Sequence, residues 1–305
     1  MTEITTVSER AYAQQLLARL EGRSFPYAGQ WELTCRCNLQ CVMCYTDPFN
    51  TPDLIKEELR YDEIVRILDE LQEAGCLELC FTGGEPFARP DFLEIYTSAK
   101  QRGFRLTLFT NGTLITTRIA DHLAADPPAA IEISFHGLTA GSFDRITQIS
   151  GSFEQCLRGI RLLLERKLPV TLKSLGMTLN RDEILEIKAL AKRFGANVHY
   201  KFGAQMRPRL DGSEAPFDLQ LREDEIRAIE GADAQMREER KRQDETERTG
   251  PRQCGGGRVS FHIDAYGRLA LCSNNRRQGY DLRTGSFRQG FYESLPGFPC
   301  RRRRP

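Results

Sequence analysis

The chain has 305 residues, of which 40% are apolar and 28% charged, and its formal net charge at pH 7 is +1. This size and composition are typical of a globular protein with a large core, and the small net charge gives no global attraction to nucleic acid or to a membrane surface. The sequence has no secretory signal and no apolar run of about 18 residues, so neither export nor membrane spanning is indicated.

The first segment, residues 1–29, is expected to form an N-terminal extension packed on the main domain. It holds a possible short helix from Ala11 to Leu20 and is too short for an independent peptide-binding domain. A strand-like run over residues 30–34 follows and leads directly into a cysteine-rich loop.

Three cysteines of that loop, Cys37, Cys41 and Cys44, stand at C-x3-C-x2-C spacing. A loop this short brings three thiolates within reach of one metal centre. A structural zinc site would need a fourth nearby ligand, whereas a [4Fe–4S] cluster held by three cysteines leaves one iron free for an outside ligand. The spacing alone favours a reaction centre, although zinc knuckles show similar runs.

Strand and helix patterns alternate after the loop, and glycines stop several of the helices. Since parallel strands need crossover helices, six such units predict an α/β fold, an open (β/α)6 partial TIM barrel with its chemistry at the carboxyl ends of the strands. The expected strands cover residues 30–34, 77–81, 104–109, 130–135, 169–177 and 198–202. The expected helices cover residues 61–74, 91–102, 113–125, a long region ending at residue 166, and residues 184–194.

The last part of the chain predicts a separate small module. A mixed-charge helix over residues 219–248 leads to a strand, a turn at Gly267 and a second strand, over residues 259–264 and 269–272. The expected domains are therefore the extension, a barrel over residues 30–215, a helical linker over residues 216–250, and a C-terminal module over residues 251–305.

A second motif supports a specific interpretation of the three cysteines. The second expected strand closes in Thr82-Gly83-Gly84-Glu85-Pro86, 38 residues after Cys44. The two motifs in this order resemble the radical S-adenosylmethionine (SAM) enzymes. The resemblance implies that the three cysteines carry a [4Fe–4S] cluster and that the turn receives the amino group of SAM. Gly83 and Gly84 expose backbone carbonyls there, and Glu85 offers a carboxylate to the ammonium.

The resemblance also implies further contacts to SAM at the ends of later strands. Ser134 begins a match to the family's Ser-x-Asp-Gly pattern, with His136 in place of Asp, and would hydrogen-bond SAM, while Arg145 would pair with its carboxylate. Asn111 ends the third strand, and Asn180 stands where the family often contacts adenine and ribose. The competing interpretations are a simple turn at Asn111, a local cap at Ser134 and a surface arginine at Arg145.

The remaining cysteines and histidines carry no ligand pattern. Cys35 is read as a bystander, because the family uses three cluster cysteines. Burial in the core or exposure without a role is expected for Cys76, Cys80, Cys156, His122, His199 and His262.

The C-terminal module resembles the start of the SPASM or twitch domains of many radical SAM enzymes, which hold auxiliary iron–sulfur clusters. Cys254, Gly267 and Cys272 form the pattern C-x12-G-x4-C, and Cys300 is the one cysteine that follows. A full SPASM domain needs more cysteines. The chain is therefore expected to be a fragment or a shortened form, with an auxiliary cluster held by Cys254 and Cys272 and otherwise incomplete or ligated from elsewhere.

The function that follows is reductive cleavage of SAM to a 5′-deoxyadenosyl radical, which abstracts hydrogen from a peptide during its maturation. Oxidation or tailoring of a small molecule, such as a sugar alcohol or a tetrapyrrole, is the alternative on the same scaffold, and a non-enzymatic zinc module is a third hypothesis. The family resemblance further implies a flavodoxin- or ferredoxin-like electron donor and a reducing cytoplasm, and no nucleic-acid or membrane partner is expected. No residue is assigned to the hydrogen transfer itself.

Overall fold

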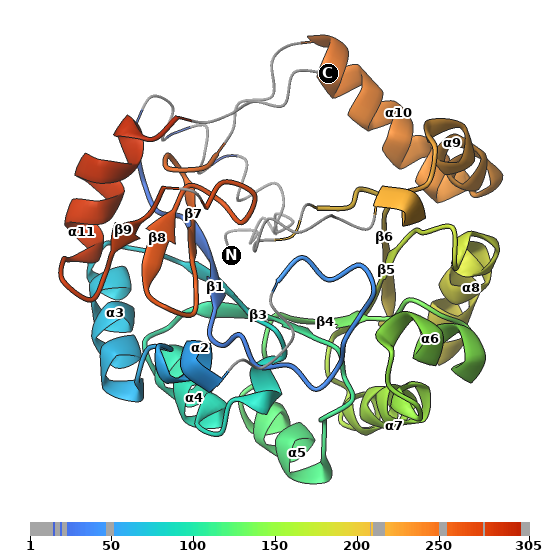
Figure 1. The fold of residues 1–305 in the computed structure, drawn as a ribbon, viewed down its shortest axis with the longest axis horizontal. Coiled ribbons are helices and arrows are strands. Elements are labelled where there is room, and N and C mark those ends of the chain that lie inside the picture. Colours follow the sequence, from blue (N-terminus) through green and yellow to red (C-terminus); the bar gives the residue numbers. More distant parts are fainter. Residues whose placement is uncertain are drawn as a thin grey trace, which may run out of the picture.

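The computed structural model describes residues 15, 19, 23–46, 52–207, 209, 217–249, 255–276 and 278–299. Most of the helix expected over residues 11–20, together with Cys254 and Cys300, lies outside these ranges. Within them the fold is α/β: helices surround a mainly parallel sheet that curves without closing, as the view along the barrel shows (Figure 1).

Six strands form the partial barrel and pair in parallel in the order of the sequence. They are β1 (Ala28–Glu32), β2 (Glu78–Thr82), β3 (Arg105–Thr110), β4 (Ala130–Ser134), β5 (Val170–Leu175) and β6 (His199–Gly203). The helices are α2 (Pro52–Lys56), α3 (Tyr61–Glu73), α4 (Phe92–Gln101), α5 (Thr117–Ala125), α6 (Ala140–Thr147), α7 (Ser152–Glu165), α8 (Ile184–Phe194), α9 (Glu223–Ala232) and α10 (Ala234–Thr249). The expected (β/α)6 architecture is confirmed.

The core lies between the sheet and the outer helices. Alternate strand residues such as Trp31, Phe81 and Ile133 are fully buried there, and Phe81 meets Phe92 of α4 edge to face, with 6.4 Å between the ring centroids. The residues between them along each strand face the inside of the barrel. The inward positions are therefore set by the same alternation that builds the core.

The C-terminal hairpin continues this sheet instead of forming a layer of its own. Its strands are β7 (Ser260–Ile263), β8 (Arg268–Ala270) and the short β9 (Tyr280–Asp281), followed by α11 (Phe287–Gln289). β7 pairs in parallel with β1, so the sheet order among the described residues is β6-β5-β4-β3-β2-β1-β7-β8-β9. The strand–turn–strand prediction is confirmed, and its attachment to β1 is new.

Two helical predictions were too long, and each break has a local cause. The expected helix over residues 219–248 divides at Asp233, whose extended backbone ends α9 and whose carboxylate accepts the backbone N–H of Met236 at the start of α10. The region before residue 166 divides into α6 and α7, because Gln148 and Gly151 adopt positive φ angles of 60° and 80°.

Candidate active site

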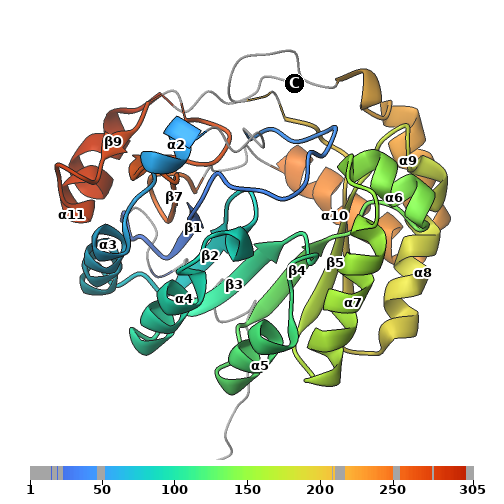
Figure 2. The same cartoon turned by 60° about the horizontal axis from the view of Figure 1, so that its bottom comes forward.

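The three cysteines lie in the loop that follows β1, at the carboxyl ends of the strands, where the blue segment in Figure 2 crosses above β2 to β5. Backbone hydrogen bonds from Gln40 to Thr147 and from Val42 to Ile146 hold this cysteine loop against the end of α6. The open end of the barrel therefore carries the loop, as expected for a parallel α/β fold.

The thiols of the loop are close enough to affect one another. Burial, with smaller contributions from the charges of Glu85 and Cys44, raises the pKa of Cys37 to about 12, and burial with the charges of Cys44 and Cys37 raises the pKa of Cys41. No three His, Cys, Asp or Glu side chains within the described ranges converge on one metal-ion position. A positively charged centre shared by several thiolates would remove this repulsion, so the donor set fits an iron–sulfur cluster.

An amide network joins the cysteine loop to the end of β3. The Asn111 side chain donates to Oδ1 of Asn38 at 3.0 Å, and its nitrogen lies 4.0 Å from Sγ of Cys37. Asn38 in turn donates to the hydroxyl of Thr113 at 2.8 Å, and the backbone N–H of Leu39 points at Sγ of Cys37 over 3.4 Å. Asn111 is thus a direct neighbour of the first cysteine. Hydrogen bonds from N–H groups to the sulfur atoms of an iron–sulfur cluster tune the reduction potential of that cluster.

Gly83 and Gly84 allow the turn after β2 to touch the stem of the cysteine loop. Gly83 has a φ of +152°, and a Cβ on either glycine would clash with a backbone carbonyl, that of Thr34 or of Arg36. The turn donates instead, from the N–H of Gly84 to Thr34 and from that of Glu85 to Arg36. The carbonyl oxygens of the two glycines accept no backbone N–H from the described part of the chain, so they remain available to an ammonium.

Glu85 lies beneath this turn, and its carboxylate faces the protein. The side chain is fully buried and accepts hydrogen bonds from the hydroxyl of Thr110 at 2.8 Å and from the backbone N–H groups of Asn111 at 2.6 Å and Phe87 at 3.1 Å. Burial raises its pKa from 4.5 to about 7, although these donors oppose the rise. In this structure the carboxylate ties the turn to the end of β3. The expected contact of Glu85 with the SAM ammonium stays a prediction.

The other expected SAM contacts surround the same opening but differ in availability. Ser134 ends β4 on its inward face, and a terminal nitrogen of Arg145 donates to the carbonyl of Leu179 at 3.2 Å. Asn180 is buried. Its amide nitrogen donates to the carbonyls of His136 and Leu175, and its amide oxygen accepts the N–H of Met177. The Asn180 side chain therefore joins the loops after β4 and β5. Its expected contact with adenine and ribose stays a prediction.

Two further residues, missed in the sequence, hold the stem of the cysteine loop. The buried carboxylate of Glu58 accepts from the hydroxyl of Thr34 at 2.6 Å and from the backbone N–H and thiol of Cys35, and buried Arg89 donates to the carbonyl of Leu33 at 2.8 Å. Cys35 is thus hydrogen-bonded to Glu58. Its interpretation as a bystander stays a prediction.

A second missed group links the C-terminal strands to the cysteine loop. Glu32 and Arg276 form a two-fold ion pair. The ring of Tyr45 contacts two guanidinium groups, whose central carbons lie 4.9 Å (Arg207) and 5.5 Å (Arg276) from the ring centroid. Arg207 also donates to the hydroxyl of Ser273 at 3.0 Å. We call Glu32, Tyr45, Arg207, Ser273 and Arg276 the Tyr45 cluster.

His262 lies beside the Tyr45 cluster on the inner face of β7. It is 1% exposed, neither ring nitrogen has a hydrogen-bond partner in the described ranges, and Nε2 is 3.9 Å from Oε2 of Glu32. Burial, and then the charges of Arg276 and Arg207, lower its pKa well below the ordinary value, so the ring is neutral at neutral pH. The expectation of a structural histidine is compatible with this burial.

The structure describes one of the two proposed auxiliary ligands. Cys272 is half-buried after β8, and Cys254 lies outside the described residues. Cys76 and Cys156 are buried in the core, as expected, whereas Cys80 is less buried and points inward from β2.

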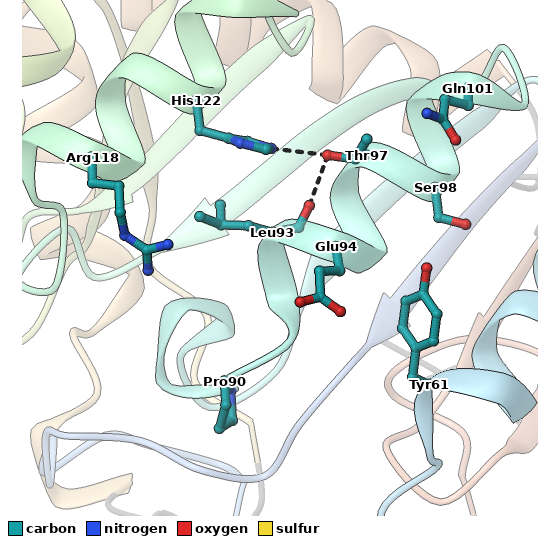
Figure 3. A pocket seen from close by; sticks show the side chains of 9 residues that line it. All are labelled: Tyr61, Pro90, Leu93, Glu94, Thr97, Ser98, Gln101, Arg118 and His122. Atoms are coloured by element: carbon teal, nitrogen blue, oxygen red, sulfur yellow. Dashed lines mark hydrogen bonds between the residues drawn. The ribbon is translucent and has the colours of Figure 1, made fainter.

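A surface hollow in the described part of the chain lies away from the cysteine loop. It measures about 460 Å³ and opens on the outside of the barrel between α4, α5 and the start of α3 (Figure 3). The Thr97 hydroxyl donates to the carbonyl of Leu93, so Nε2 of His122, 2.9 Å away, is the donor to Thr97. None of the candidate site residues named from the sequence lines this hollow. Within the described ranges, no helix has both the length and the apolar character needed to cross a membrane.

The chain is similar in sequence to known proteins. A family model described as the radical SAM superfamily matches residues 31–191. An AdoMet-dependent heme synthase from Methanosarcina barkeri is 36% identical over 192 residues, which cover 62% of this chain and 54% of that protein. A PqqA peptide cyclase from Granulibacter bethesdensis is 32% identical over 175 residues, which cover 55% of this chain and 46% of that one.

The fold itself is similar to that of solved structures. A crystal structure of Streptococcus suis SuiB superposes with a TM-score of 0.70 at 13% identity, covering 96% of this chain and 73% of that one. The aligned part of this chain spans about half the length of the curated relatives it matches.

Proposed function

This chain belongs to the radical SAM superfamily of enzymes, and on that premise we propose that it modifies a peptide by hydrogen abstraction during peptide maturation. As a radical SAM enzyme it uses a [4Fe–4S] cluster and SAM. The observation that carries the proposal for this chain is the meeting of the cysteine loop, the Gly83–Gly84 turn and Asn111 at one end of the barrel.

Each part of the site has a role under this proposal. Cys37, Cys41 and Cys44 hold the cluster, which with SAM supplies a 5′-deoxyadenosyl radical when reduced. The free carbonyl oxygens of Gly83 and Gly84 accept hydrogen bonds from the SAM ammonium.

The remaining residues position or complete the SAM site. Glu85 acts through the end of β3 and keeps Asn111 beside the first cysteine. Ser134 and Arg145 contact SAM from β4 and α6, and Arg145 is the cation for the SAM carboxylate. Asn180 contributes by joining the loops on which this edge of the site is built.

The peptide substrate is supported by the similarity to a PqqA peptide cyclase and by the open barrel, which leaves room for a bulky substrate. Tailoring of a tetrapyrrole is the second candidate, because the relative named heme synthase is 36% identical over a similar length. An external flavodoxin- or ferredoxin-like donor in a reducing cytoplasm is part of either proposal.

An auxiliary iron–sulfur cluster at Cys254 and Cys272 is a further part of the proposal. Its support is the position of the neighbouring residues: Asn275 donates to the carbonyl of Pro299 at 2.8 Å, which brings the residues before Cys300 to the turn after Cys272. Two or three thiolates in this module would leave ligand positions to be filled from elsewhere.

Anoxic reconstitution tests the proposed function. The full chain, given iron, sulfide, SAM and a reductant, is expected to form 5′-deoxyadenosine and to change the mass of a peptide encoded beside its gene. Cys41→Ser should lose the cluster and both activities, whereas Cys35→Ser serves as the matched cysteine control and should retain iron. A chain that binds zinc and no iron under these conditions would refute the proposal.

A further inference from the structure

Two lysines on the inner face of the barrel share one carboxylate. Nζ of Lys173 on β5 lies 3.0 Å from Oε2 of Glu132 on β4, and Nζ of Lys201 on β6 pairs with Oε1 of the same side chain. Nζ of Lys173 also lies 3.5 Å above the ring of Phe109. These residues come from four successive strands, β3 to β6, and none of them belongs to a sequence motif.

The alternation of burial places this group inside the barrel. Ile131, Ile133 and Leu172 are fully buried in the layer beneath the outer helices. Because successive strand residues point to opposite faces of a sheet, Glu132, between the two isoleucines, and Lys173, next to Leu172, face inward. Lys173 is in register with Ser134 at the end of β4. The lysines are therefore just inside the open end that carries the cysteine loop.

The charges of the group do not balance. Burial alone would raise the pKa of Glu132, but the two lysines outweigh it and the pKa lies below its ordinary value, so this carboxylate is ionised. The Glu132 side chain is 6% exposed, whereas those of Lys173 and Lys201 are 38% and 58% exposed. One buried negative charge thus faces two accessible positive charges.

The lysines also have hydrogen-bonding capacity to spare. Each ammonium has three donors, and the described contacts to protein oxygen use one on each lysine, the one to Glu132. A second carboxylate is the chemical group that would restore the charge balance and accept the remaining donors. Burial raises the pKa of the Cys80 thiol on β2, and the charges of Lys173 and Lys201 oppose this rise. Both lysines therefore lie on the same, inward side of the sheet as Cys80.

From this arrangement we infer that Lys173 and Lys201 bind a carboxylate group of the substrate inside the barrel, with Glu132 holding both lysines in place. The inference rests on the proposed function, because it names the chemistry of the substrate for the same site. The carboxylate has two possible sources, an acidic residue of a peptide or a propionate-type side chain of a tetrapyrrole. Either would be anchored on β5 and β6 while another part of the molecule faces the cysteine loop.

Binding measurements on the full reconstituted chain test this inference. The probes are a fluorescently labelled Glu-Ala repeat peptide with its Gln-Ala counterpart, and coproporphyrin III with its methyl ester. The wild type is expected to bind the acid form of at least one pair about tenfold more tightly than the neutral form, and Lys173→Gln and Lys201→Gln should each remove most of that preference. Lys173→Arg should keep it, because the charge remains.

The control is Lys192→Gln, an exposed lysine on the outward surface of α8, which should bind like the wild type. The pair that shows the acid preference identifies the source of the carboxylate. An equal affinity of the wild type for acid and neutral forms of both pairs would overturn the inference, as would a preference that survives both Gln substitutions.

The test separates this inference from the proposed function. If the wild type changes a peptide's mass and both Gln variants do so with unchanged KM, the lysines bind no substrate carboxylate and the proposed function stands. If lysine-dependent acid binding occurs without 5′-deoxyadenosine formation, the carboxylate site stands and the proposed function fails.

Discussion

At the scale of single residues, glycine determines how closely the turn after β2 approaches the cysteine loop. The Gly84→Ala substitution puts a methyl group against the carbonyl of Arg36, so we expect it to destabilise the protein by roughly 1–3 kcal/mol and to weaken SAM binding. Gly231→Ala is the matched control: it meets open space in α9 and should stabilise by about 0.5 kcal/mol. Thermal unfolding and calorimetric SAM titration of both variants check this, and equal effects would contradict it.

A second residue-scale prediction concerns the pH dependence of stability. Burial raises the pKa of Glu85 from 4.5 to about 7 in the folded state, so the folded protein binds the proton more tightly than the unfolded chain. Its stabilising contribution is complete below pH 4.5 and is lost as the pH rises to 7, a change of roughly 3 kcal/mol. Glu85→Gln should remove this slope.

Urea unfolding from pH 4.5 to 8 measures the effect as the difference in unfolding free energy between variant and wild type. That difference should rise with pH in favour of Glu85→Gln and level off above pH 7. Glu94→Gln, an exposed glutamate on α4, should show no such rise. Parallel curves for Glu85→Gln and the wild type would show that the Glu85 carboxyl titrates normally.

At the scale of elements, the Tyr45 cluster makes the C-terminal strands a support for the cysteine loop. Arg276 reaches back from the turn after β8 to Glu32, the last residue of β1. Removing one partner of a buried pair typically costs about 3–5 kcal/mol, because the other charge stays buried. Loss of this ion pair should therefore also loosen the attachment of the cysteine loop.

Arg276→Ala is accordingly expected to lower both the unfolding temperature and the iron retained after gel filtration. Arg276→Lys should recover little of either, because an ammonium cannot make the two-fold contact. Arg288→Ala on α11, an exposed arginine over the ring of Tyr292, is the control and should retain iron. Full iron retention in Arg276→Ala would show that the cysteine loop is independent of this contact.

The elements also show what periodicity can and cannot predict. The strand and helix patterns and the motif spacing were sufficient for the (β/α)6 architecture and for the hairpin at Gly267, because both depend on residues close in sequence. The pairing of β7 with β1 was not predictable, since it joins positions more than 200 residues apart. Arg276 was missed for the same reason, and Asp233 was missed because one cap inside a polar helix leaves the charge pattern unchanged.

For the candidate site, the sequence indicated where the residues lie in the fold but not which protein groups they hydrogen-bond. The motif placed Glu85 and Asn111 correctly at one edge of the sheet. It could not show that the Glu85 carboxylate faces the protein, because that depends on Thr110 and the backbone of a neighbouring strand. Lys173 and Lys201 carried no signal at all, since single lysines in alternating strands look like ordinary exposed positions.

At the scale of the whole molecule, iron and sulfide analysis gives the number of iron–sulfur clusters. If the auxiliary cluster exists, reconstituted wild type should hold more iron and sulfide than one [4Fe–4S] cluster requires. The double variant Cys254→Ala and Cys272→Ala should fall to the content of one cluster. The double variant Cys76→Ala and Cys80→Ala controls for loss of thiols as such and should not change the iron content. An unchanged iron content in the first variant would rule out the auxiliary cluster.

The unclosed sheet has a consequence for how a long substrate gets in and out. β6 and β9 are the two edges of the sheet. At the carboxyl ends of the strands, the Arg207–Ser273 hydrogen bond joins the segments that follow β6 and β8, and no strand ladder joins the described residues of these segments. A side-chain hydrogen bond of this kind can break and re-form without disturbing any backbone pairing. We therefore expect a long substrate to enter through the side of the barrel, by the middle of its length, without the need for a free end.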